Sequence, residues 1–397
     1  MGEKTSSLRI GIIVFLAIIG SWAVCMGDTT LKQPFFVQYL PMLCYILDFI
    51  FIIFLRKNVF HNTDVFLVLF PVLCFILHIT DVYDRNHYSA NALLFLNISL
   101  FAFITDRELL KAFNILKVFF VVSCAFGIVA YISYMFHLGL PYTTVPYYTE
   151  DSAVYVDYHF AYIVDKIGII RLCGLLNEPG FLGTLVSFFL ITDGYNLKKI
   201  SNIIMFTAGL FSLSSAFFII SFVYFVLIYF KSVKGLTILL ISAVSIRFFL
   251  LNTDNEMISA MTISKFSGNL LELRSNEYIE RALTRLFETG DFLWGYGNGY
   301  KAAHFPEGAS IKTSIIDFGL LGTAFLYLPL LLLSSIKAGS IREKRIFVLC
   351  FFISILQRYN IFTVIYFLIL FGGMVYIQSK KVAKITPPSH THLKSLA

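Results

Sequence analysis

Long apolar runs alternate with short basic clusters along the whole sequence. Hydrophobic residues make up 58% of the 397 positions and charged residues only 14%, whereas a soluble domain carries about 25% charged residues. A chain of this kind holds more apolar surface than one aqueous core buries, so lipid is its natural solvent. The sequence therefore predicts an all-α, polytopic integral membrane protein with a single membrane domain over residues 1–397.

A membrane-spanning helix needs about 20 apolar residues. The apolar runs predict about twelve transmembrane helices. The two shortest, at 200–213 and 346–357, are short for a full crossing, so eleven helices remain an alternative. The predicted spans are residues 8–26, 35–55, 64–80, 90–105, 112–137, 179–192, 200–213, 214–230, 236–251, 314–334, 346–357 and 361–378.

The basic clusters predict the orientation of these spans. With the N-terminus in the cytoplasm, pairs such as Lys198 and Lys199 fall inside, and the short outside loops hold only Lys32, Arg85 and Arg358. This asymmetry is the positive-inside pattern, and it places both termini in the cytoplasm. It also explains the net charge of +7 without nucleic acid as a partner.

Two long segments, 138–178 and 252–313, are then outside, which is the periplasmic side in a bacterial cell. Both contain aromatic residues, glycines and charges, and we expect short helices in them. The sequence has no P-loop and no dinucleotide-binding motif, which argues against an ATP-driven pump. Because the outside holds no ATP or nucleotide sugar, energy for any chemistry there must come with the substrate or from a gradient. The six cysteines form no CxxC or Cys/His cluster, so we expect no metal site and no cofactor.

The stretch "RLCGLLNEPGFLG" (171–183) places charges and turn residues directly before an apolar run. Proline is favoured at the first helical position, and an acidic residue beside it favours the helix dipole, so we expect a helix from Pro179. One interpretation is only a capped helix with an interfacial arginine. The other places Arg171, Asn177 and Glu178 around an anionic or hydroxyl-rich ligand, because helix N-termini and guanidinium groups bind such groups.

The second long segment carries "ELRSNEYIERALTRLFETGDFLWGYGNGYKAAH" (272–304). Arg281 and Arg285 are i, i+4 neighbours and can share a helix face with Arg274 nearby. A solvated amphipathic helix, with Glu277 paired to Arg281, is the simpler alternative. The glycines of "GYGNG" predict a flexible turn whose backbone approaches a ligand closely.

The first long segment is rich in tyrosine, including Tyr155 and Tyr158. Tyrosine at a membrane boundary usually forms an anchoring belt. Its flat ring and hydroxyl also suit a sugar, so both residues are candidates for substrate binding.

These motifs in order, "R..G...EPG..G", "LFSLSS", the arginine-bearing loop, "GYGNG" and "DFGLLG", resemble the Wzy-type O-antigen and polysaccharide polymerases and, more distantly, the O-antigen ligases. The resemblance covers about residues 169–366. It implies transfer of a glycan from undecaprenyl diphosphate onto a new lipid-linked repeat unit, at the outer face of the bacterial inner membrane. Such an enzyme serves lipopolysaccharide or other polysaccharide biosynthesis as a metal- and nucleotide-independent glycosyltransferase.

For such a reaction, Arg171, Arg274 and Arg281 would stabilise the departing diphosphate. Glu178 by its motif, or His304 by its chemistry, would act as general base. The related ligases carry a histidine at a place that corresponds here to Ser310, and its absence favours a polymerase. The candidate substrate-binding residues are Asn177, Arg285, Tyr296, Tyr155 and Tyr158.

The resemblance also implies partners, namely the lipid-linked glycan, membrane lipid, a chain-length regulator and a flippase. Two other classes stay open. An O-antigen ligase uses related chemistry, and a polysaccharide flippase or secondary transporter is also polytopic and positive inside. A transporter commonly shows repeated halves with broken helices, and the sequence shows no such repeat.

Overall fold

The computed structural model describes residues 2–19, 101, 104–146, 153–166, 169–229, 237, 277–297, 299–304, 310–356, 358 and 362–385. These residues are mostly helical, as the sequence predicts. The predicted spans at 35–55 and 64–80 lie outside the described residues, as do nearly all of 90–105 and 236–251.

The described helices follow the remaining predicted spans closely. Their bounds are α1 Gly2–Ile19, α5 Asp106–Met135, α6 Pro179–Thr192, α7 Ile200–Phe211, α8 Ser215–Tyr229, α14 Ile311–Ala338 and α15 Arg342–Ile355, followed by α16 Val364–Phe367, a π turn Leu368–Gly372 and α17 Gly373–Ile385. The start of α6 at Pro179 is the predicted one.

Among these residues, α5 and α14 are long and apolar enough to cross a membrane, judged by length and composition. Helix α6 has 14 residues and therefore rises only about 21 Å, against a hydrocarbon core of about 30 Å. Twelve crossings and their orientation remain a prediction.

The first long segment folds differently from the expectation of short helices. It forms a four-stranded antiparallel sheet in the order β1-β2-β3-β4, with β1 Thr143–Pro146, β2 Ala153–Asp157, β3 Tyr162–Lys166 and β4 Ile169–Gly174. The fold is therefore not purely helical. Tyrosines and β-branched residues at alternating positions favour strands. This alternation was missed because the tyrosines were interpreted as an anchoring belt at the membrane boundary.

The sheet buries both of its faces. Val156, Ile163 and Leu172 join the main hydrophobic core, while Tyr155, Val164 and their neighbours form a small separate core. The first face packs on α5, where Leu172 comes to 3.1 Å from the position that a Cβ on Gly127 would occupy. The helix thus fixes the position of β4 and of the chain that follows it.

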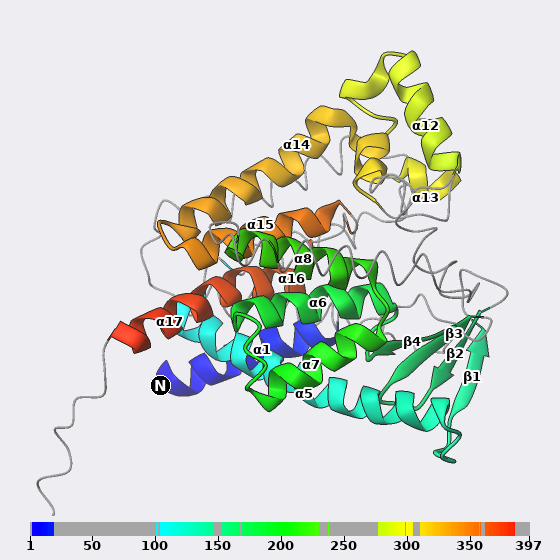
Figure 1. Ribbon diagram of the computed structural model, residues 1–397. Helices are drawn as coiled ribbons and strands as arrows, with labels where there is room; N and C mark the ends of the chain where they lie inside the picture. Colours follow the sequence, from blue (N-terminus) through cyan, green and yellow to red (C-terminus); the bar gives the residue numbers. More distant parts are fainter. Residues whose placement is uncertain are drawn as a thin grey trace, which may run out of the picture.

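The two long segments emerge at the same end of the helix bundle. Figure 1 shows the sheet and the helices α12 (Glu277–Glu288) and α13 (Tyr300–His304) at one end, with the N-terminus and the end of α17 at the other. This arrangement agrees with the predicted placement of both segments on one side.

Helix α6 lies at the centre of the bundle, and all of its residues are buried. It packs against α7, α8, α15, α17 and β4. A Cβ on Gly183 would come to 2.5 Å from Cβ of Ser214 and 3.0 Å from Cβ of Phe217. The glycine therefore allows close approach of α6 and α8, as small residues do between helices in membranes.

We expect Gly183→Ala to destabilise the protein by about 1–3 kcal/mol, the usual effect of overpacking, although alanine favours a helix more than glycine. The midpoint of unfolding of the detergent-solubilised protein measures the change. Gly11→Ala in α1 is the control, because a Cβ there meets nothing within 4 Å. An unchanged midpoint for Gly183→Ala would contradict this packing.

Candidate functional site

The predicted site residues fall into two groups at the same end of the bundle. Tyr155, Arg171, Asn177 and Glu178 surround the start of α6, and the other group lies on α12, α13 and the turn between them. Figure 1 shows α12 and α13 apart from the junction of β4 and α6. Arg274 lies outside the described residues.

Glu178 is the N-cap residue of α6, with extended backbone (φ −140°, ψ 141°) and Pro179 directly after it. Its carboxylate makes no capping hydrogen bond to its own helix. Oε2 instead accepts a hydrogen bond from Nη2 of Arg358 in an ion pair. The Glu178 side chain is 30% exposed, so the ion pair borders solvent at the N-terminal end of α6.

Arg358 comes from the connection between α15 and α16 and also lies over the ring of Phe181, 5.4 Å from its centroid. From the sequence alone, Arg358 was predicted only to be one of the few charges in the short outside loops. The sequence carries one indication that Arg358 is unusual, because an arginine in a short outside loop runs against the positive-inside pattern. The partner, 180 positions away, could not be identified from the sequence.

Asn177 carries an unsatisfied polar atom beside this pair. The residue is 6% exposed, and its Oδ1 is buried with no hydrogen-bond partner within the described ranges. A buried polar atom without a partner costs about 1–3 kcal/mol. A donor from a ligand or water would remove that penalty, so Asn177 is the residue here that most directly indicates a binding site.

Tyr155 supports Asn177 rather than offering a ring to solvent. It is 1% exposed, and its hydroxyl donates to the backbone carbonyl of Asn177. Tyr158 is half-buried beside Tyr142, with 5.5 Å between ring centroids, and burial raises the pKa of its hydroxyl.

Arg171 on β4 contacts the turn between α7 and α8. Its Nε donates to the carbonyl of Ser212 at 3.3 Å, and Nη2 reaches the carbonyl of Leu213 at 3.5 Å. Cations are favoured at helix C-termini, so the guanidinium stabilises the end of α7. The "LFSLSS" and "EPG" motifs are therefore joined in space through this arginine.

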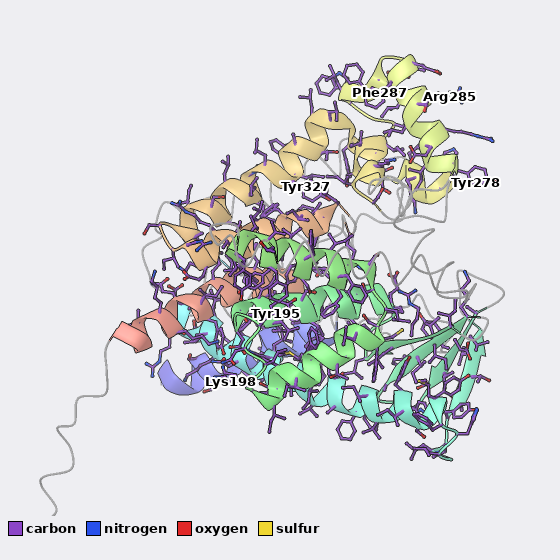
Figure 2. All side chains as sticks on the ribbon, viewed as in Figure 1. Tyr195, Lys198, Tyr278, Arg285, Phe287 and Tyr327 are labelled. Atoms are coloured by element: carbon purple, nitrogen blue, oxygen red, sulfur yellow. The ribbon has the colours of Figure 1, made fainter. Side chains whose placement is uncertain are left out.

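In the second group, Arg281 and Arg285 lie on the exposed face of α12. Figure 2 labels Tyr278, Arg285 and Phe287 on this helix. Its opposite face packs Ile279 and Ala282 against Ile316 of α14. An ion pair between Lys312 and Glu280 also ties α12 to α14.

The "GYGNG" turn contacts the chain itself where we expected a ligand. Tyr296 N donates to Ile316 O at 2.8 Å and Gly297 N to Asp317 O at 2.9 Å. Gly295 has φ +78°, and a Cβ on it would lie 2.4 Å from N of Gly319. The glycine therefore serves close contact between the turn and the first residues of α14.

Beyond the turn, Asp317 accepts a hydrogen bond from Lys301 N at 2.8 Å, which holds the start of α13. Burial lowers the pKa of the Lys301 side chain, and the charge of Asp317 opposes that shift. The turn, α13 and the first part of α14 thus form one connected unit.

His304 ends a row of three rings in contact, in which Tyr300 and His304 are stacked and Tyr296 is tilted. Tyr296 and Tyr300 lie 4.7 Å apart, and Tyr300 and His304 4.1 Å apart, between ring centroids. His304 Nδ1 lies 2.9 Å from the carbonyl of Tyr300. Since a carbonyl only accepts, Nδ1 is the donor in this contact, and Nε2 is the acceptor nitrogen of the corresponding tautomer.

Comparison of the chain with protein-family models, curated proteins and solved structures gives no match. Within the described ranges, no three His, Cys, Asp or Glu side chains converge as a metal site would require. The geometry itself therefore carries the functional argument.

We expect Gly295→Ala to release the segment 291–304 from α14, because its Cβ would overlap backbone atoms of Asp317 and Gly319. Faster hydrogen exchange and proteolysis in this segment would report the release. Gly290→Ala is the matched control, since Gly290 also has positive φ (+82°) but open space around its Cβ position. Equal effects of both substitutions would mean that backbone strain alone is responsible.

Proposed function

We propose that the chain is a polytopic inner-membrane glycosyltransferase that polymerises undecaprenyl-diphosphate-linked oligosaccharide units at the outer face of the membrane. The acceptor hydroxyl oxygen bonds to the anomeric carbon of the donor glycan while the bond from that carbon to the diphosphate breaks. The acceptor proton passes to a base, and undecaprenyl diphosphate leaves. The reaction needs no nucleotide, because the donor carries its own leaving group.

The observation that carries this proposal is the site at the start of α6. It combines the ion pair of Glu178 and Arg358, the nearby Arg171, and the orphaned Oδ1 of Asn177. A helix N-terminus with adjacent guanidinium groups favours a phosphate-bearing ligand, and an unpartnered amide oxygen suits a sugar hydroxyl donor.

The arrangement of basic residues supports the proposed orientation. Lys344 binds Gln378 of α17 at 2.5 Å, and Lys199 and Lys380 meet at Asp193. These lysines surround the end of the bundle opposite to the sheet. An excess of lysine on one side agrees with a cytoplasmic placement of that side, which leaves the candidate site outside.

The departing diphosphate gains negative charge in the transition state, so preorganised cations lower the barrier. Arg171 and Arg358 are the candidates at α6, and Arg281 and Arg285 are the candidates on α12. Arg274 keeps the role that the resemblance implies for it. Tyr155 supports the α6 site through its hydrogen bond to Asn177, while Tyr158 lies beside Tyr142 and keeps only its predicted role in substrate binding. The ring row containing Tyr296 offers a stacking surface for sugar.

For the general base, we propose His304 rather than Glu178. Oε2 of Glu178 already accepts a hydrogen bond from Arg358, so it is engaged by another donor where a base must accept the acceptor proton. His304 is exposed and directs Nε2 away from its own helix carbonyl contact. In this proposal Glu178 holds Arg358 in position at the N-terminal end of α6.

An O-antigen ligase is the nearest alternative, and a flippase or transporter is the next. Purified protein with lipid-linked repeat units distinguishes them. A ladder of polymer supports the polymerase, transfer only to added lipid A core supports the ligase, and translocation without new glycosidic bonds supports the flippase. A chain-length regulator would change the distribution of the ladder.

We expect Arg171→Ala and Arg281→Ala each to lower chain extension about 10²–10³-fold, the usual effect of removing one transition-state charge contact. Lysine at either position should restore activity only in part, because it lacks the bidentate fork. Arg345→Ala, which removes a guanidinium bound to Gly339 O at the other end of the bundle, is the control. Normal extension by both arginine variants would refute the proposed role.

We expect His304→Asn to reduce extension about 10²–10⁴-fold, the range for loss of a general base, while protein abundance stays normal. Glu178→Gln should reduce chain extension less, because it weakens the ion pair that positions Arg358 and leaves the proposed base, His304, in place. Initial rates of polymer formation under saturating donor measure both variants. An active His304→Asn together with an inactive Glu178→Gln would assign the base to Glu178.

A further inference from the structure

Two hydroxyl groups at the start of α14 are buried without a hydrogen-bond partner. Ser310 is the N-cap residue of this helix, and Thr313 is its third helical residue. They are 2% and 1% exposed, and neither Ser310 Oγ nor Thr313 Oγ1 has a partner within the described ranges. A buried hydroxyl without a partner lowers stability, so two of them in one helical turn indicate a ligand that supplies the missing hydrogen bonds.

The usual structural roles of such hydroxyls are not filled here. An N-cap serine normally accepts a hydrogen bond from an N–H of the first turn, but the Ser310 side chain makes no capping bond. A hydroxyl inside a helix can donate to a carbonyl one turn earlier, but α14 begins at Ile311, so neither hydroxyl has an earlier turn of this helix beside it. Ser314 in the same turn differs, because its Oγ lies 3.2 Å from the hydroxyl of Tyr327.

The N-terminal end of a helix favours an anion. Its first N–H groups have no partner within the helix and carry partial positive charge, and hydroxyl groups add donors that phosphate oxygens accept. Lys312, the one charged residue of this turn in the sequence, is already paired with Glu280. The first turn of α14 therefore offers neutral donors to a phosphate group, next to α13 (Figure 1).

We propose that the first turn of α14 binds the diphosphate of the acceptor unit, while the α6 site holds the diphosphate that leaves. The assignment to the acceptor rests on the function proposed above, in which both substrates carry a diphosphate. The leaving diphosphate gains charge in the transition state and needs cations, which Arg171 and Arg358 supply at α6. The acceptor keeps its bond to diphosphate throughout, so its charge does not change and neutral donors are enough to hold it.

Binding of undecaprenyl diphosphate without sugar tests the site apart from catalysis. The purified full chain in detergent micelles is titrated with this lipid, and native mass spectrometry counts the molecules retained. We expect two for the unchanged protein and one for Ser310→Ala/Thr313→Val, because each hydroxyl contributes about tenfold to affinity as a hydrogen bond to a charged group. The midpoint of unfolding without lipid should stay equal or rise, since the variant removes only unsatisfied groups. A purely structural role for the hydroxyls predicts a lower midpoint.

The matched control is Thr323→Val/Ser334→Ala. It makes the same two substitutions farther along α14, at hydroxyls that are also buried and unpartnered in the described part of the chain, and it should retain two lipids. Two lipids on Ser310→Ala/Thr313→Val, or equal loss in both double variants, overturns the site. Displacement of the second lipid by equimolar inorganic diphosphate also overturns it, since the ligand would then be a free anion.

Chain extension distinguishes failure of this site from failure of the proposed function. With preformed lipid-linked polymer as donor, Ser310→Ala/Thr313→Val should raise the KM for the acceptor unit about 100-fold and leave kcat nearly unchanged. An unchanged acceptor KM overturns the site while the polymerase stands. An unchanged protein that retains two lipids yet extends no chain refutes the polymerase and supports diphosphate binding at α14. If the double variant does not fold, Ser310→Ala alone should still bind the second lipid about tenfold more weakly.

Discussion

The complete burial of α6 is the constraint on which the rest of the structure depends. A helix surrounded on every side by apolar neighbours can carry charge only at its ends, because an unpaired charge within it would be strongly destabilising. Both ends follow this rule. Glu178 pairs with Arg358 at the N-terminal end, and Asp193 is shared by lysines at the C-terminal end.

The two ends of α6 differ in the sign of the charge that the helix dipole favours. Glu178 lies where the helix dipole favours an anion, whereas Asp193 lies at the end where the dipole favours cations. Several ammonium groups at Asp193 compensate both the carboxylate and the dipole, and they anchor α5 and α17 to α6. At the other end, Arg358 pairs with Glu178. That end also holds the half-buried Arg171 and the Asn177 Oδ1 that has no hydrogen-bond partner in the described part of the chain, and the proposed binding site rests on these features.

The helices could be predicted because long apolar runs bounded by Pro, Gly or basic residues leave few alternatives, and Pro179 marked the start of α6 to the residue. The strands could not be identified while the tyrosines were interpreted as a boundary belt. Pairings such as Glu178 with Arg358 depend on contacts between distant parts of the chain, which no local spacing encodes. "GYGNG" was recognised as a close-approach turn, but its partner, the backbone at Gly319, became visible only in the fold.

Helix α14 provides a physical link between the two groups of candidate residues. It bends at Gly319, which has φ +64° and ψ −175°, and the part before the bend holds the glycine turn and α12. Beyond the bend, Tyr327, labelled in Figure 2, reaches back to Ser314 with a hydroxyl separation of 3.2 Å. Its ring also contacts the ring of Phe362, four positions after Arg358, with 5.5 Å between the ring centroids. Tyr327 therefore contacts both the first part of α14, which packs against α12, and Phe362, four positions after Arg358, so a chain of direct contacts runs between the two groups of candidate residues.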